Sequence, residues 1–243
     1  MIILIGTGHV FDLSSALLRI LDEKNPDVVC VELDKQRYNA LMMKLSNPQG
    51  YKSAGRQLPF VYRLLARFQD SMASEYGVTA GNEMLTAIDY AQGHQLSVEF
   101  IDMNAQYLFT KMLKSMSLSE KFKLLLSGFG GFFVSRKHVE KELRQFEKDF
   151  DSYIEQVGKK FPTIKRVLID ERDHYMAQQL AEINEQHERV VAVMGDGHIP
   201  GVSESLKSKD VEFEMIRLRE LRSQKPSESD STTASFTTEY EEL

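Results

Sequence analysis

The chain has 243 residues, of which 42% are hydrophobic, and a formal net charge of −6 at pH 7. This length and apolar content are enough to bury one large α/β core. The acidic balance argues against nucleic acid as the main partner, because phosphate binding needs a basic face. Cys30 is the only cysteine, so no internal disulfide can form, and we expect a reducing, cytoplasmic location.

Neither the first residues nor the longest later apolar stretch predicts membrane insertion. The first residues, MIILIGTGH, lack a basic segment, and their apolar run is far shorter than the ~7–15 residues of a signal peptide's hydrophobic region. The longest later apolar stretch, LLLSGFGGFFV at 124–134, is shorter than the ~18 residues that cross a bilayer. We therefore expect no leader and no transmembrane helix.

Apolar runs alternate with helical patterns, which predicts an α/β fold with a mainly parallel central sheet flanked by helices. In chain order the expected elements are a strand at 1–6, a helix at 14–24, a strand at 28–33, helices at 34–46, 56–77 and 82–94, a strand at 96–102, a helical insertion at about 107–158, a helix at 162–186, and strands at 189–195 and 211–218. We expect a single domain over 1–222, and a disordered polar tail over 223–243.

Two Gly-x-Gly-His units directly follow strand-like runs, Gly6–His9 near the start of the chain and Gly195–His198 near its end. Glu32 and Asp102 stand at the ends of the second and third predicted strands. The carboxyl ends of parallel strands share one edge of a sheet, where open α/β folds bind ligands, so we expect both histidines and both carboxylates in one crevice. Glycines beside each histidine allow tight turns and a close approach of backbone N–H groups to a ligand. These motif glycines are Gly6, Gly8, Gly195 and Gly197.

Charged residues also fall on the apolar stripe of the helix at 162–186. At ~100° per residue, Glu171 and Arg172 lie inside that stripe, whereas Asp170 and Asp173 are expected to point away. Charges on a buried face need partners or a role, so both are candidate site residues, with a structural ion pair as the alternative. Glu83 is a further candidate, although a solvated acid in a first helical turn would explain it as well.

These segments resemble the TraB family, which includes the pheromone-shutdown protein PrgY and is distantly similar to the Tiki metalloproteases. The matching pieces, in order across about residues 2–202, are IGTGHV, PDVVCVELDKQRYNAL, GNEMLTAIDYA, ERDHYMAQQL and VVAVMGDGHIPG. The family's two Gly-x-x-His motifs, with a Glu and an Arg between them, correspond to Gly6 with His9, Gly195 with His198, Glu32 and Arg172. Glu83 matches the acid of the family's Glu-Met helix. The resemblance implies the fold of the EreA/ChaN/Tiki group and metal-dependent peptide hydrolysis.

The chain departs from this family in two places. Many relatives carry Asp-Arg-Asp after the third strand, whereas this chain has Asp102-Met103-Asn104 and lacks the charges of the last two positions. Many prokaryotic relatives also continue into C-terminal membrane helices, whereas here a polar tail follows. A membrane function is therefore not carried over from them.

Two neutral imidazoles and a carboxylate can bind a divalent transition metal with open positions, so His9, His198 and Glu32 are candidate ligands for Mn, Co or Zn. Glu171 or Glu83 would then serve as general base, and Arg172 would hold a substrate carboxylate or stabilise an oxyanion. Neutral histidine ligands predict affinity that weakens as the pH falls through about 6.5. The spacing is not that of a compact zinc motif, so metal-free acid–base catalysis stays open.

We therefore predict a metal-dependent hydrolase acting on a peptide or a small signalling molecule. A non-catalytic protein that sequesters a peptide or pheromone is the alternative. Nucleotide binding is a weaker one, because Phe11 occupies the place of the last glycine of the dinucleotide fingerprint.

The stretch at 124–134 lies between basic clusters. Its glycines suit a turn between helices, which favours a lid or a homodimer contact over a peripheral membrane contact.

Overall fold

The computed structural model describes residues 1–8, 13–46, 82–131, 155–156 and 158–223. Several predictions therefore lie outside the described residues: His9, the helix at 56–77, much of the insertion, and nearly all of the polar tail. Within the described residues, no helix is long and apolar enough to cross a membrane.

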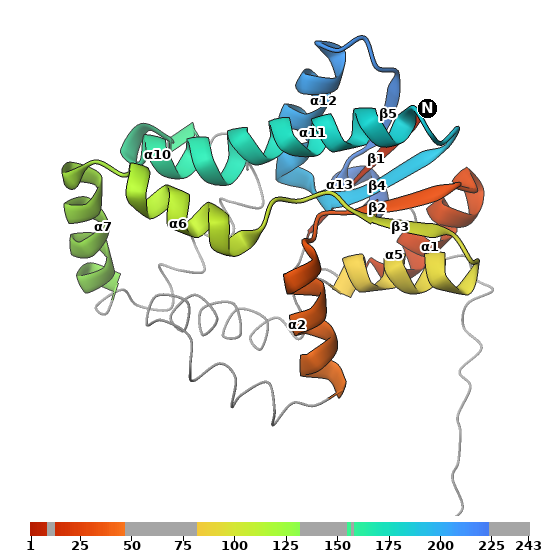
Figure 1. The fold of residues 1–243 in the computed structure, drawn as a ribbon, viewed down its shortest axis with the longest axis horizontal. Helices are drawn as coiled ribbons and strands as arrows, with labels where there is room; N and C mark the ends of the chain where they lie inside the picture. The colour runs from red at the N-terminus through yellow and green to blue at the C-terminus, as the bar shows by residue number, and fades with distance from the viewer. Residues whose placement is uncertain (9–12, 47–81, 132–154, 157, 224–243) are drawn as a thin grey trace, which may run out of the picture.

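Five parallel strands form the central sheet in the order β3-β2-β4-β1-β5 (Figure 1). They are β1 (Ile2–Thr7), β2 (Val28–Val31), β3 (Ser97–Phe100), β4 (Val190–Gly195) and β5 (Phe213–Ile216). The predicted parallel α/β sheet is confirmed. Each strand begins and ends within two residues of the predicted first and last residue. The central strands β1, β2 and β4 are apolar along almost their whole length, as expected of parallel strands covered on both faces.

Helices cover both faces of this sheet. On one face, α1 (Ser14–Lys24), α5 (Asn82–Gly93) and α13 (Leu218–Ser223) share a buried layer with Ile3 and Ile5 of β1. On the other, α11 (Glu171–Asn184) and α12 (Ile199–Lys207) share a buried layer with Ile2 and Leu4. The alternation follows from the period of two residues in a strand. Each fully buried Leu or Ile contributes roughly 1.5–3 kcal/mol, so these two layers hold the strand ends in place.

The described part of the predicted insertion is helical and has a small core of its own. It contains α6 (Ala105–Ser115) and α7 (Leu118–Gly131), and α6 packs against α10 (Pro162–Lys165) and the turn that follows. The buried side chains of this core are Leu108, Met112, Met116 and Val167. Because α7 continues to Gly131, the turn predicted at Gly128–Gly131 is wrong there: glycine in a helix costs only about 1 kcal/mol.

The helix predicted at 162–186 is interrupted by a π-helical turn, Arg166–Asp170, between α10 and α11. A π turn adds one residue to the helical repeat and so rotates the following residues by about 100°. This rotation corrects one prediction: Asp173, expected to point away, is 5% exposed on the inner stripe of α11. Asp170 points outward as expected and binds Lys165.

Candidate active site

Glu32 follows β2 and lies at the centre of the sheet's carboxyl edge. Its Oε2 accepts a hydrogen bond from the backbone N–H of Gly195 at 2.7 Å, and its Oε1 accepts one from Arg172 Nη2. A Cβ on Gly195 would lie 3.3 Å from that Oε2. The glycine therefore allows the carboxylate to approach the backbone closely.

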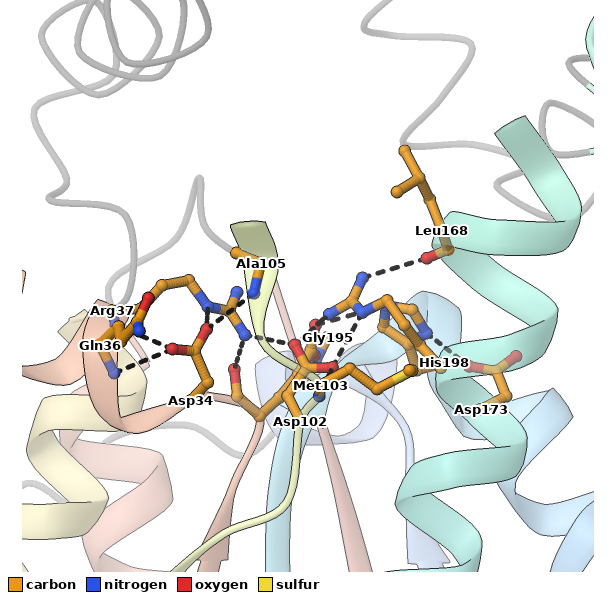
Figure 2. Close-up of polar contacts among 12 residues, drawn as sticks. Asp34, Gln36, Arg37, Asp102, Met103, Ala105, Leu168, Asp173, Gly195 and His198 are labelled. Atoms are coloured by element: carbon orange, nitrogen blue, oxygen red, sulfur yellow. Dashed lines mark hydrogen bonds and ion pairs between the residues drawn. The ribbon is translucent and has the colours of Figure 1, made fainter. Parts of the chain in front are cut away.

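His198 lies between two carboxylates, one on each ring nitrogen. It belongs to a short 3₁₀ turn, Asp196–His198, that joins β4 to α12. Its Nδ1 is 2.5 Å from Asp173 Oδ1, and its Nε2 is 3.3 Å from Glu32 Oε1. Figure 2 shows the imidazole of His198 facing Asp173 of α11. The side chains of His198, Glu32 and Asp173 are each no more than 10% exposed.

The surroundings of His198 and Glu32 favour the charged form of each side chain. Burial by itself lowers the pKa of His198, but the Glu32 charge and the hydrogen bond that the ring donates to Asp173 outweigh it and raise that pKa to about 9. Burial likewise raises the pKa of Glu32, but the charges of His198 and Arg172 hold it well below its ordinary value. Without a bound cation, the pair is therefore an imidazolium facing a carboxylate.

Asp173 reaches His198 because the third residue of α12, Gly201, has no side chain at the contact. A Cβ on Gly201 would lie 2.0 Å from Asp173 Oδ2, so a larger residue would force α11 and α12 apart. The π turn that rotates Asp173 inward and the glycine that admits its carboxylate thus act on the same contact.

Arg172 bridges the carboxylates of two strand ends. Its Nε and Nη2 donate to Asp102 at 3.0 and 2.7 Å, and Nη2 also donates to Glu32. Its Nη1 donates to the Leu168 carbonyl in the π turn at 3.1 Å (Figure 2). Every nitrogen of this guanidinium therefore has an acceptor on the protein.

Two residues of this centre were missed from the sequence, Asp34 and Arg37. Asp34 caps α2 (Lys35–Ser46) by accepting from the backbone N–H groups of Gln36 and Arg37 at 2.9 and 3.1 Å. Arg37 returns to Asp34 through Nε at 2.8 Å and reaches Asp102 through Nη2 (Figure 2). The D-x-x-R spacing just after Glu32 is the signal that would have pointed to them, since an N-cap and the third helical residue lie together.

We call these residues the strand-end cluster. It contains four carboxylates, two guanidinium groups and one imidazole. Its members are Glu32, Asp34, Arg37, Asp102, Arg172, Asp173 and His198. Among the residues that the structure describes, four carboxyl groups face three positive side chains when the imidazole is protonated. Because partly buried charge of one sign is costly when unbalanced, the cluster favours one more positive charge.

The two glycine-histidine motifs leave the sheet at the same edge. Thr7 of β1 pairs in register with Gly195 of β4. The chain therefore leaves β1 at Gly8 next to the loop that carries Gly197 and His198. A glycine is needed at position 6, because a Cβ there would lie 2.2 Å from Asp196 Oδ1 in the neighbouring loop. His9, which comes two residues after Thr7, lies outside the described residues.

Asp196, between the two motif glycines, fixes the turn to the end of the sheet. Its carboxylate accepts from Arg217 Nε and Nη2 at 2.9 and 2.8 Å and from the N–H of Leu218 at 2.8 Å. This carboxylate stabilises the position of the loop that carries His198.

Of the two remaining candidates, Glu171 makes ion pairs outside the strand-end cluster and Glu83 is buried. Glu171 pairs with Lys111 Nζ at 2.9 Å and Arg166 Nη1 at 3.0 Å, which is the structural ion pair left open as an alternative. Glu83 is 1% exposed in the first turn of α5, so the reading as a solvated acid is wrong. Among the described residues, which do not include His9, no three His, Cys, Asp or Glu side chains form a group that could hold a metal ion.

Comparison with known proteins gives matches over most of the chain. The model of the TraB/PrgY/gumN family matches residues 1–214. The uncharacterized protein MJ1365 of Methanocaldococcus jannaschii is 29% identical over 211 residues, which are 85% of this chain and 53% of that protein. TraB domain-containing proteins of Bos taurus and Homo sapiens are 25% and 24% identical, over 83% of this chain and 61% of theirs.

The chain thus spans between about half and three fifths of the length of these relatives. The matched range 1–214 contains every residue of the strand-end cluster, from Glu32 to His198.

Proposed function

Because this chain belongs to the TraB/PrgY/gumN family, we propose that it is a hydrolase of a peptide or small signalling molecule and that it works with a divalent metal ion at the strand-end cluster. The observation that carries the proposal is the orientation of His198. Asp173 holds its Nδ1 at 2.5 Å and leaves Nε2 facing Glu32. Metal-binding histidines are commonly held in this way, with one ring nitrogen donating to a carboxylate.

The spacing of two donor atoms supports a shared metal ion. Nitrogen and oxygen ligands about 2.0–2.2 Å from one ion lie roughly 3.0–3.5 Å from each other, and His198 Nε2 is 3.3 Å from Glu32 Oε1. The surplus of carboxylates in the strand-end cluster favours a cation there. His198 and Glu32 would hold the metal, with His9 as the predicted third ligand.

A bound divalent metal would supply Lewis-acid polarisation and a hydroxide-like water near neutral pH. The low pKa of Glu32, caused by His198 and Arg172 against the effect of burial, supports a ligand role over a general-base role, which needs a pKa near the working pH. Each nitrogen of Arg172 donates a hydrogen bond to a protein acceptor. These contacts favour a role for Arg172 in holding Glu32 over a role in binding a substrate carboxylate. The contacts of Glu171 do not support a general-base role, and Glu83 stays a predicted catalytic residue.

Isothermal titration with Mn²⁺, Co²⁺ and Zn²⁺ tests the metal part of the proposal. We expect the wild type to bind one ion, and His198→Ala to bind it at least about tenfold more weakly because a ligand is removed. His174→Ala, an exposed histidine on the same helix α11, is the matched control and should bind like the wild type. Equal binding by wild type and His198→Ala would leave the metal site unsupported.

Turnover of a peptide library, followed by mass spectrometry with and without chelator, tests the hydrolase part. We expect cleavage that the chelator abolishes and that His198→Ala lacks. Peptides that bind without being cleaved would instead indicate a sequestering protein, and cleavage that resists the chelator would indicate metal-free acid–base catalysis.

A further inference from the structure

We propose that Arg37 is a positioning residue for this site, because it holds Asp102 and thereby determines how Arg172 is shared between Asp102 and Glu32. The inference rests on the proposed function in taking Glu32 as part of the reacting centre. Arg37 touches neither His198 nor the Glu32 carboxylate in the described contacts, so it would act through its neighbours.

The carboxylate of Asp102 receives two guanidinium groups at one oxygen. Its side chain is only 1% exposed. Oδ2 accepts from Arg172 Nη2 at 2.7 Å and from Arg37 Nη2, whereas Oδ1 accepts from Arg172 Nε and the Met103 N–H. With two positive partners, Oδ2 attracts Arg172 Nη2 less strongly than it would with one, and the same Nη2 remains bound to Glu32 Oε1.

Arg37 is itself held firmly at the start of α2. Its Nε donates to Asp34 Oδ2 at 2.8 Å, and the same Asp34 oxygen accepts from the Ala105 N–H at the start of α6 at 3.3 Å. Arg37 Nη2 also lies 3.5 Å from the Glu32 carbonyl. Asp34 therefore holds the guanidinium of Arg37 in place where α2 and α6 both begin, and the guanidinium contacts Asp102 from there (Figure 2).

Attachment of α2 does not depend on Arg37 alone. Tyr38 and Leu41 of α2 pack against the buried core, and the ring of Tyr38 packs on Phe100 with centroids 5.2 Å apart. Removing Arg37 would leave Asp102 Oδ2 with one cation, which would draw Arg172 away from Glu32. Glu32 would then be held less tightly at the Gly195 N–H.

Hydrogen exchange of the Gly195 backbone amide measures how tightly Glu32 is held, and it needs neither metal nor substrate. Losing a hydrogen bond to a carboxylate costs about 1.5 kcal/mol or more, so we expect Arg37→Gln to speed exchange of this amide about tenfold. Arg37→Lys keeps the positive charge beside Asp102 and should recover most of the protection. Lys35→Ala, an exposed residue of the same helical turn, should exchange like the wild type.

Unchanged Gly195 exchange in Arg37→Gln would overturn the inference. An equal acceleration at the core amides of Val193 and Cys30 would also overturn it, because it would mean general loss of stability. Should the wild type bind no divalent ion, the proposed function would fail, while the exchange comparison would still decide the role of Arg37.

Discussion

At the scale of single residues, the chemistry of this protein depends on what surrounds His198. An imidazole between two nearly buried carboxylates gains a proton readily, because the two carboxylates together stabilise the charged ring more than burial destabilises it. A divalent cation at Nε2 would satisfy the same carboxylates. Proton and metal therefore compete for one place, and the pH at which they exchange is set by Glu32 and Asp173.

This competition predicts how cation affinity depends on pH. The sequence alone predicts affinity that weakens below about 6.5, but a pKa of about 9 for His198 moves the window upward. We expect affinity to fall about tenfold per pH unit as the pH drops below about 9, because one proton must leave for each ion bound. Titrations in buffers of different ionisation enthalpy measure that proton release. Affinity independent of pH between 7 and 9 would contradict a His198 ligand.

The same shift predicts the pH dependence of stability in the metal-free protein. The folded pKa of about 9 lies above the ordinary value of 6.5, so protonation of His198 stabilises the fold fully below about pH 6.5, and this contribution is lost as the pH rises through about 9. His198→Gln should cost about 3–5 kcal/mol at neutral pH, since it removes the positive charge that lies between the Glu32 and Asp173 carboxylates. The difference in melting temperature between wild type and variant should shrink from pH 7 to 10; a constant difference would argue against the imidazolium.

At the scale of elements, the contact between α11 and α12 decides whether His198 is oriented at all. The π turn rotates α11 so that Asp173 faces inward, and Gly201 leaves room for its carboxylate. Two helices that belong to different crossovers of the sheet therefore determine one ring orientation.

We expect Gly201→Ala to disturb this contact, because the added Cβ would lie 2.0 Å from Asp173 Oδ2. Such overpacking costs about 1–3 kcal/mol, which urea unfolding can measure. Glu204→Ala, at an exposed position of the same helix, serves as the control and should change stability by less than about 0.5 kcal/mol. A Gly201→Ala variant as stable as the wild type would mean that α12 can shift at no cost.

At the scale of the whole molecule, periodicity predicted the elements but not their neighbours. Apolar runs such as that of β4 reveal buried parallel strands, and the end of β2 predicted the position of Glu32 at the carboxyl edge of the sheet. The inward turn of Asp173 could not be predicted, because an ideal helical repeat gives no sign of a π turn. Arg37 was missed since its role comes from Asp102, 65 positions later in the sequence.

The strand order also bears on how the polypeptide acquires this site as it is synthesised. Neither β1 nor β2 pairs with the other; each pairs with β4, whose residues begin at Val190. A ribosome must therefore release most of the chain before the first strand meets its central partner, and contacts between such distant residues slow folding. Glu32 and His198 come together only at that late step, so a nascent chain contains Glu32 and Asp102 long before His198 is added and the centre can form.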